Sequence, residues 1–303
     1  MKRVSQIDAL PWVCLNGKMV PAKTARVSVF DRSFQLGDGL FETLRIIDGW
    51  PVQWRDHWKR FTGTARLLGI KLPITARSLL ALLPELLRRN RVSCTILRVH
   101  LSRGVGPRGY SPAPAKNPVW LASLYPAPKV IPGQPQPVRV GLSPFRLGGT
   151  LLDGHKTAGR ALHVLAKHAA DLQDCDDVVF LDHQDNVLEA TSSNFFWLSG
   201  RELITPPLSS GILPGTTRQT ILKIAPELGL RVREQTSPLR TVLRSHGAFL
   251  SVCTRGISEV VELAGDRLPQ SELVPRLHAR LEAVWQAEAR RHRGRLGGSR
   301  PRN

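Results

Sequence analysis

A lysine just before a helix is the first residue whose surroundings could support chemistry. Lys156 stands one residue ahead of residues 157–172, in which apolar side chains recur at helical spacing. The positive end of a helix and partial burial both depress a lysine's pKa, and the free amine can then form a Schiff base or accept a proton. A solvated surface lysine could have the same local sequence, so the interpretation of Lys156 depends on whether other segments of the chain supply matching chemical groups.

Residues 189–194 form a second candidate, a polar turn ahead of an apolar strand. Glu189 supplies a carboxylate, and the hydroxyls of Ser192 and Ser193 follow before an aromatic run. Hydroxyls and backbone N–H groups in such a turn can hold phosphate oxygens. An ordinary turn that caps a strand has a similar composition, so this segment predicts an anion site only together with others.

A third candidate opens a helix. Gly215, Thr216 and Thr217 follow a proline, and a helical pattern continues to about residue 228. The first N–H groups of a helix lack intrahelical acceptors and its N-terminus is positive, so this segment can bind an anion. Many helices begin in this way without a ligand.

The loop at residues 102–110 is the fourth candidate. It carries Arg103, Arg108 and Tyr110 on a backbone rich in glycine and proline. An arginine can hold a carboxylate through two parallel hydrogen bonds, which predicts a substrate contact; a solvated charged loop is the alternative.

Together the four segments match the needs of one cofactor. Pyridoxal phosphate requires a Schiff-base lysine, a carboxylate for its ring nitrogen and an anion site for its phosphate. Nucleotide binding has no support, because the chain has neither a GxxxxGK[ST] loop nor a GxGxxG between a strand and a helix. The four cysteines are far apart, which predicts no metal site and favours a reducing, cytoplasmic location.

A proline-rich segment divides the elements that must position these residues. We predict a smaller N-terminal domain at residues 1–125, a linker at 126–137, a larger cofactor-binding domain at 138–288 and a basic disordered tail at 289–303. Strand and helix patterns mix in both halves without regular alternation, which favours an α+β fold.

Hydrophobic spacing places the individual elements. Helices are expected at residues 56–68, after Thr75 as N-cap, and at 157–172. The last of these places Leu162, Leu165, Ala166, Ala169 and Leu172 on one apolar face, the face that an amphipathic helix turns towards the core. Strands are expected at residues 27–30, 44–47, 95–101, 119–124, 138–142, 178–181, 195–198 and 249–253.

The charge is strongly basic. The 303 residues hold 43 Lys and Arg against 24 Asp and Glu, a net charge of +19. Six of the arginines lie in the last fourteen residues, so the excess predicts a basic surface and tail, or an anionic substrate, ahead of a nucleic-acid site. No apolar run approaches the roughly 20 residues of a membrane helix, and no secretory signal is expected.

Six motifs in a fixed order resemble the class IV, or fold type IV, pyridoxal-phosphate enzymes. The resemblance runs from about residue 13 to residue 261, and it is carried by residues 37–43 (GDGLFET), 57–60 (HWKR), Lys156, 189–194 (EATSSN), 203–207 (LITPP) and 213–218 (LPGTTR). It implies a two-domain fold of the D-amino-acid-aminotransferase type, with the cofactor between the domains, and a homodimer.

The same resemblance implies roles for single residues. Lys156 would be the Schiff-base lysine, and Glu189 would pair with the pyridine nitrogen. The phosphate would be held by Arg60, Ser192, Ser193, Gly215, Thr216, Thr217 and Thr254, the last standing beside Cys253, where relatives carry a threonine or asparagine. The substrate would be bound by Phe41, Arg108, Tyr110 and Arg160.

Within that family the sequence is most similar to 4-amino-4-deoxychorismate lyases, on residues 31–39, 102–110 and 142–147. Such an enzyme converts a small anionic amino substrate to 4-aminobenzoate and pyruvate, a step towards folate. A transaminase of D- or branched-chain amino acids is the alternative. A basic nucleic-acid-binding protein is a remote alternative that rests on the charge alone.

Overall fold

The computed structural model describes residues 9–294, which form two compact units. The first unit holds the described residues up to Pro128, the short segment Lys156–Gly159 and the described residues from Trp285 on. The second holds Lys129–His155 and Arg160–Val284. The change of unit after Pro128 falls inside the predicted linker, but two later segments also belong to the first unit, which the linear division into domains did not anticipate.

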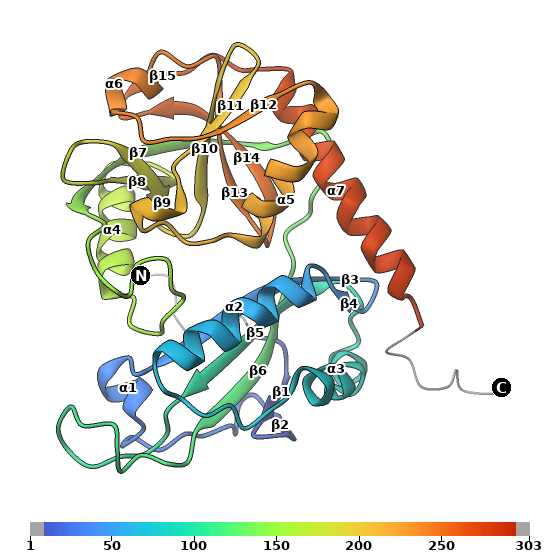
Figure 1. Cartoon of the computed structure of the whole chain (residues 1–303). Helices are drawn as coiled ribbons and strands as arrows, with labels where there is room; N and C mark the ends of the chain where they lie inside the picture. Colours follow the sequence, from blue (N-terminus) through green and yellow to red (C-terminus); the bar gives the residue numbers. More distant parts are fainter. Residues whose placement is uncertain (1–8, 295–303) are drawn as a thin grey trace. The chain divides into compact units, whose positions relative to one another are not determined.

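The first unit is built on a six-stranded antiparallel sheet with the strand order β2-β1-β6-β5-β3-β4 (Figure 1). Its strands are β1 (Trp12–Leu15), β2 (Lys18–Pro21), β3 (Gly39–Ile47), β4 (Trp50–Pro51), β5 (Thr95–Ser102) and β6 (Val119–Tyr125). Its helices are α1 (Arg32–Leu36), α2 (Trp54–Leu67) and α3 (Ala76–Asn90). The strand predicted at residues 27–30 is wrong: Val27, Val29 and Phe30 are exposed and pair with no strand.

Alternation along β3 decides which side chains meet the helices. Glu42 and Leu44 line a small cavity together with Trp54 and Phe61 of α2 and Leu79 of α3. Phe41 lies one residue away and points to the opposite face, because successive side chains of a strand alternate.

Thr75 caps α3 as expected, accepting a hydrogen bond from the Ser78 backbone N–H at 3.1 Å.

The second unit contains a nine-stranded mixed sheet with the order β12-β11-β10-β13-β14-β7-β8-β9, to which β15 adds beside β14. Its strands are β7 (Gln136–Arg146), β8 (Asp177–Leu181), β9 (Val187–Ala190), β10 (Asn194–Ser199), β11 (Glu202–Thr205), β12 (Arg231–Glu234), β13 (Ala248–Val252), β14 (Gly256–Leu263) and β15 (Asp266–Arg267). Its helices are α4 (Ala161–Leu172), η1 (Leu208–Ser210), α5 (Thr216–Ile224), η2 (Ala225–Leu228) and α6 (Leu239–Val242). Helix α7 (Leu273–His292) begins in this unit and belongs to the first unit from Trp285 on.

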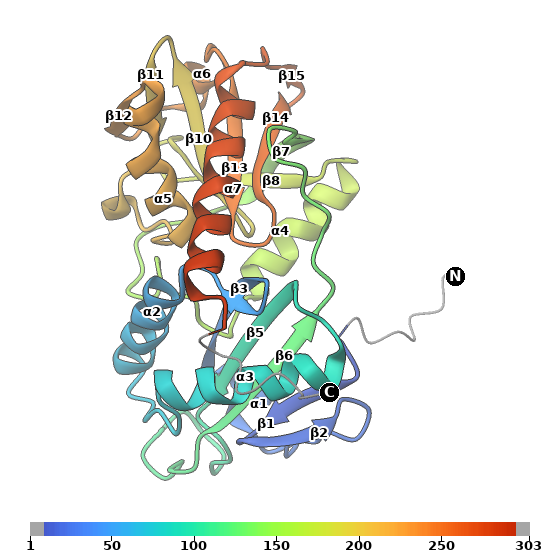
Figure 2. The same cartoon turned by 90° about the vertical axis from the view of Figure 1, so that its right-hand side faces the viewer.

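Helix α7 runs alongside β13 and β14 and carries the chain back to the first unit (Figure 2). It ends at His292, so residues 289–292 are helical although they were assigned to the disordered tail. The Trp50 indole stacks on His292 with ring centroids 3.9 Å apart and donates to the Glu288 carboxylate at 3.2 Å. These contacts explain the longer helix; residues 295–303 of the predicted tail lie outside the described residues.

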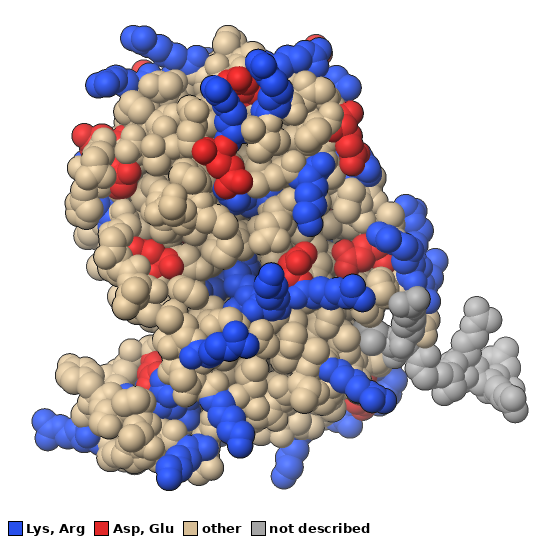
Figure 3. Space-filling view, viewed as in Figure 1, with Lys and Arg blue, Asp and Glu red and all other residues tan. Residues whose placement is uncertain are grey.

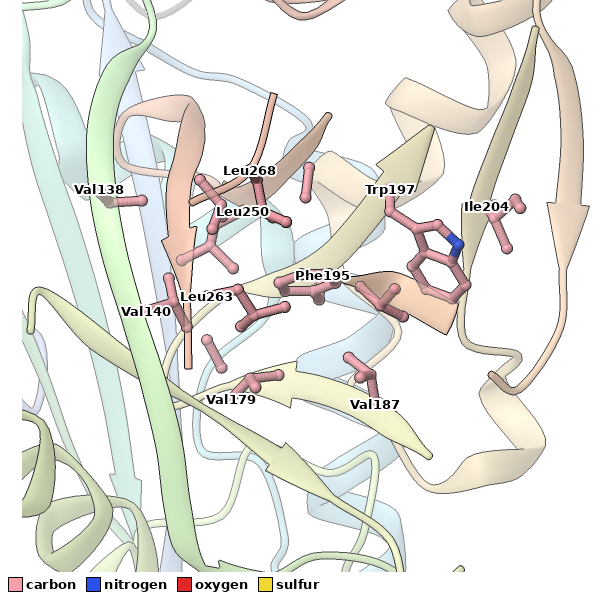
Figure 4. Close-up of a cluster of buried hydrophobic side chains, with 14 of the residues drawn as sticks. Val138, Val140, Val179, Val187, Phe195, Trp197, Ile204, Leu250, Leu263 and Leu268 are labelled. Carbon is pink, nitrogen blue, oxygen red and sulfur yellow. The ribbon is translucent and has the colours of Figure 1, made fainter. Parts of the chain in front are cut away.

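Branched and aromatic side chains fill the core of the second unit (Figure 4). It includes Val138, Val140, Val179, Val187, Phe195, Trp197, Ile204, Leu250, Leu263 and Leu268. The polar residues of interest stand at the ends of these buried strands: Glu189 precedes Ala190 at the end of β9, and Asn194 begins β10. A rigid core therefore fixes the backbone from which they project.

Helix α4 packs through alanine rather than leucine. Ala166 and Ala170 are fully buried, whereas Leu165 and Leu172 are 52% and 76% exposed, so their predicted burial is wrong. The small face of Ala166 and Ala170 packs in a core with Val178 and Phe180 of β8, which turns the larger side chains towards the surface.

Candidate active site

The backbone of Lys156 is fixed by β3, more than a hundred residues earlier in the chain. The Phe41 N–H donates to the Lys156 carbonyl at 3.1 Å, and the Ala158 N–H donates to the Gly39 carbonyl at 2.7 Å. Gly37 has a positive φ of 67°, and a Cβ there would lie 2.8 Å from the Gly159 Cα. Two glycines therefore allow the segment Lys156–Gly159 to add to the edge of β3.

The Lys156 amine lies over an aromatic ring that also contacts an arginine. Its Nζ is 4.8 Å from the centroid of the Phe41 ring, and the Arg98 Cζ is 3.8 Å from the same centroid. Burial lowers the pKa of Arg98, and among the described residues its guanidinium has no hydrogen-bond or ion-pair partner. Each cation is attracted by the π electrons of the ring, so the same ring contacts both the Lys156 amine and the Arg98 guanidinium.

Sequence reasoning missed Arg98. The available signal was its place in β5, where Arg98 and His100 alternate with the apolar side chains Leu97, Val99 and Leu101. Period-2 alternation puts such cations together on one face of the sheet. The structure shows that this face is the one that carries Phe41.

On the opposite face of β3, a buried carboxylate holds Arg60. The Glu42 oxygens accept hydrogen bonds from the Arg60 Nε and Nη2 at 2.7 and 2.8 Å, and the His57 Nδ1 lies 2.7 Å from Oε2. Burial by itself would raise the pKa of Glu42, but the charge and hydrogen bonds of Arg60, with those of His57, lower it to about 2. Burial lowers the pKa of His57, and the charges of Arg60 and Lys156 lower it further.

We expect Glu42→Gln to destabilise the protein near neutral pH by about 3 kcal/mol, because it leaves the Arg60 charge buried without its carboxylate. The pKa of Glu42 is about 2 in the folded chain against 4.5 for an unperturbed glutamate. Its contribution is therefore complete above pH 4.5 and is lost as the pH falls towards 2. Urea unfolding between pH 2.5 and 7 should show a difference from the parent that grows with pH.

The matched control for this prediction is Glu85→Gln. Glu85 also pairs with two arginines, Arg88 and Arg89, but on the surface of α3, where solvent screens the charges. We expect the free energy of unfolding of the Glu85→Gln variant to differ little from that of the parent protein at any pH. Equal effects for the buried and the surface glutamate would contradict the assignment.

In the second unit, the polar turn and the helix N-terminus meet at Glu189. Its Oε1 and Oε2 each lie 3.1 Å from the Leu213 backbone N, and Oε2 accepts from the Asn194 Nδ2 at 2.9 Å. The Asn194 Nδ2 also donates to the Leu213 carbonyl at 2.9 Å. Two segments selected separately from the sequence, residues 189–194 and 213–218, are thus joined around one buried carboxylate.

The N-terminus of α5 has the features of a phosphate site. Gly215 is its N-cap residue and supplies no side-chain cap, and a Cβ at Gly215 would lie 2.0 Å from the Asn194 Oδ1. Thr216 and Thr217 are buried, and the Thr217 Oγ1 has no hydrogen-bond partner. A buried orphan hydroxyl at a positive helix end, where the N-cap residue supplies no side-chain cap, fits a phosphate group.

The remaining residues predicted for the anion site differ in their burial. Ser192 is exposed and Ser193 is buried, and Thr254 is half-buried in the turn between β13 and β14. The hydroxyl that orders the turn at 189–194 belongs instead to Thr191, which donates to the Asp177 Oδ1 at 2.7 Å. Sequence reasoning did not select this pair.

The predicted substrate residues lie on different units. Arg108 and Tyr110 belong to the first unit and are exposed, Tyr110 at 88%. Arg160 belongs to the second unit, where its Nη2 donates to the His155 carbonyl at 2.6 Å and its Nη1 lies 3.1 Å from the His163 Nε2. Lys156, Phe41 and Arg60 are in the first unit, and Glu189 and the α5 N-terminus are in the second.

A lysine set against a sheet edge, a buried carboxylate and an uncapped helix N-terminus are the parts of a pyridoxal-phosphate site. The sequence model described as amino-transferase class IV matches residues 39–263, and the chain belongs to that family. Pyridoxal 5′-phosphate is the cofactor of the family, and the fold is that of the two-domain fold type IV enzymes.

Known members of the family with similar sequences catalyse different reactions. A Methanocaldococcus jannaschii protein, provisionally named a branched-chain-amino-acid aminotransferase, is 32% identical over 254 residues, covering 84% of this chain and 88% of that one. An aminodeoxychorismate lyase from Vibrio harveyi is 30% identical over 249 residues, covering 82% and 90%. The crystal structure of a branched-chain aminotransferase from Thermoproteus uzoniensis superposes with a TM-score of 0.85 at 23% identity, covering 94% and 97%.

No helix between residues 9 and 294 is long and apolar enough to cross a membrane. Over the same residues, no group of three or more His, Cys, Asp or Glu side chains could hold a metal ion.

Proposed function

We propose that this protein is a pyridoxal-phosphate-dependent aminodeoxychorismate lyase, which releases 4-aminobenzoate and pyruvate from 4-amino-4-deoxychorismate. The observation that carries the proposal is the Arg98 guanidinium, which lies over the same ring as the Lys156 amine and has no acidic partner among the described residues. The substrate has two carboxylates, and Arg98 and the exposed Arg108 are two cations that would bind them. An apolar amino acid would offer a carboxylate to only one of them.

In the proposed enzyme, each part of the cofactor has its own set of residues. Lys156 would bind its aldehyde carbon, and Glu189 would pair with the ring nitrogen. The phosphate would be bound by the N–H groups of residues 215–217 and the hydroxyls of Thr216 and Thr217, together with Arg60, Ser192, Ser193 and Thr254. The bound cofactor supplies a protonated ring that accepts an electron pair.

The protein's own residues then handle the protons and charges. Lys156 would accept the proton from ring carbon C4 of the substrate and would return a proton to the departing pyruvate. Glu189 would keep the ring nitrogen protonated, and its orientation is fixed by Leu213 and Asn194. Glu42 holds the Arg60 guanidinium through two hydrogen bonds, and Arg60 would bind the phosphate.

The experiment is direct. Purified holoenzyme is given 4-amino-4-deoxychorismate, and 4-aminobenzoate is followed by its fluorescence. Release at many turnovers per enzyme supports the proposal. Its absence, with amino-group exchange between an amino acid and 2-oxoglutarate or pyruvate, would instead establish a transaminase, the activity named for the Methanocaldococcus jannaschii relative.

The proposal includes a homodimer in the cytoplasm. The first unit exposes four large apolar side chains within eight residues, Val27, Val29, Phe30 and Phe34, with exposures between 53% and 72%. Such a patch is typical of a protein interface, and all four cysteines are free thiols. We expect light scattering to give twice the mass of 33.6 kDa, and Phe30→Asp with Phe34→Asp to shift the protein towards monomer. A monomeric parent protein would contradict the proposal.

The basic surface alone does not favour the nucleic-acid alternative. On the face in Figure 3, lysine and arginine are spread over the whole surface, whereas aspartate and glutamate lie mostly in the upper part of the view. A binding groove for a phosphate backbone would need these cations to be aligned.

A further inference from the structure

A buried arginine in the first unit supports the loop that carries Arg108 and Tyr110. Arg32 is the first residue of α1 and is 4% exposed. Its Nη1 donates to the Gly109 carbonyl at 3.0 Å, and its Nη2 donates to the Tyr110 carbonyl at 3.1 Å. The two terminal nitrogens of one guanidinium therefore hold the carbonyls of the two residues that directly follow Arg108.

The third nitrogen of Arg32 is fixed by a carboxylate shared with a second arginine. The Arg32 Nε donates to the Asp38 Oδ2 at 2.8 Å, and the Arg103 Nε donates to the same oxygen at 2.7 Å. Burial opposes the charge of Asp38, but the hydrogen bonds and charges of Arg103 and Arg32 prevail and lower its pKa. Arg103 in turn donates to the carbonyls of Leu68 and Gly69, which anchors the group to the end of α2.

The loop crosses directly over the stem of Arg32. A Cβ at Gly106 would lie 2.8 Å from the Arg32 Cδ, so only glycine fits at this crossing. The start of the loop is bound as well: the Arg32 N–H donates to the Gly104 carbonyl at 2.9 Å, and the Gly104 N–H donates to the Ser102 Oγ at 2.9 Å. The loop backbone is thus held at Gly104, Gly109 and Tyr110, while the Arg108 and Tyr110 side chains are exposed.

We propose that Arg32, oriented by Asp38, is a positioning residue that places Arg108 and Tyr110 for a carboxylate-bearing substrate. The inference rests on the proposed function, in which Arg108 binds a substrate carboxylate. A loop held in its binding conformation loses less conformational freedom when the substrate binds, so the effect falls on KM. Arg32 itself touches neither substrate nor cofactor.

The test is a double-mutant cycle with Arg32→Lys and Arg108→Ala. Lysine keeps the charge, but its single ammonium cannot reproduce the planar fork that binds Asp38 and both carbonyls. We expect Arg32→Lys to raise KM for 4-amino-4-deoxychorismate about tenfold, with kcat within twofold and the cofactor absorbance unchanged. In the Arg108→Ala background, Arg32→Lys should raise KM less than twofold, because the residue that it positions is already gone.

Hydrogen–deuterium exchange supplies a readout that does not depend on catalysis. We expect the amides of residues 104–111 to exchange at least tenfold faster in Arg32→Lys than in the parent holoenzyme, with the exchange of α3 unchanged. Arg88→Lys, on the exposed surface of α3, is the matched control and should change neither KM nor exchange. Should Arg32→Lys fail to fold, Gly106→Ala displaces the loop from the same stem and should give the same coupled rise in KM.

Independent effects of Arg32→Lys and Arg108→Ala on KM, or unchanged exchange in the loop, would overturn the inference. An unchanged KM in Arg108→Ala would overturn it too. Failure of the lyase proposal is distinguishable, because the unaltered enzyme would then release no 4-aminobenzoate. The same cycle is in that case measured with an amino acid and 2-oxoglutarate, whose carboxylates Arg108 would bind.

Discussion

Lys156→Ala is expected to lower kcat for 4-aminobenzoate release by about 10³-fold or more. The alanine methyl group can neither hold the cofactor aldehyde nor move the proton at ring carbon C4. The backbone contacts of this segment with Phe41 and Gly39 involve only main-chain atoms, so the substitution should leave the fold intact. The loss should therefore be chemical, with thermal unfolding of the cofactor-free protein unchanged.

Borohydride reduction followed by peptide mass spectrometry checks this result. In the parent enzyme, the reduced cofactor should be found on the peptide that contains Lys156, and in the variant no peptide should carry it. Lys167→Ala is the matched control, since Lys167 is an exposed lysine on α4 that pairs with Asp171. It should retain full activity and the Lys156 adduct. Turnover by Lys156→Ala at the rate of the parent enzyme would contradict the proposed mechanism.

The second large effect is expected for Glu189→Gln, which should lower kcat by about 10²-fold or more. The amide has the size of the carboxylate and can still accept from the Leu213 N–H, but it has no charge to keep the cofactor nitrogen protonated. Without that proton the ring withdraws electrons poorly. We expect KM to change much less than kcat, because the charge acts mainly on the transition state.

Kinetics and the absorbance of the bound cofactor, measured as a function of pH, test this prediction. The variant should show a shifted cofactor titration together with the lower kcat. Glu272→Gln replaces an exposed glutamate of the same unit and should change neither quantity. A variant with parent kcat and spectrum would show that Glu189 does not face the ring nitrogen.

Local patterns were sufficient for much of the fold. Helix α3 begins after its Thr75 cap, and α2 matches the spacing of its aromatic residues, because a cap and a 3.6-residue period are properties of a single segment. The strand expected at residues 27–30 failed for a physical reason. A run of residues with high β-propensity forms a strand only when a neighbouring strand pairs with its backbone, and no strand of the described structure pairs with residues 27–30.

Packing across distant segments was beyond such patterns. The exposed Leu165 and Leu172 show that a helix with two usable apolar faces buries the one that its sheet accommodates, here the alanine face. Arg98 was missed because a functional role for an arginine in a strand becomes visible only when its contacts, here with the Phe41 ring, are known. Likewise, Arg32 gains its role from carbonyls nearly eighty residues away.

By itself the sequence determined the family, the α+β class, the cofactor and the residue types expected to bind it. The order of short motifs can be recognised in a sequence without knowing which residues contact one another. Only the tertiary structure decided that Lys156 is fixed to β3, that Glu189 receives the N–H of Leu213, and that Glu42 holds Arg60. These pairings join segments whose contacts depend on sheet register and glycine-permitted close approach. Register and approach are set when the whole chain packs, and no single segment encodes them.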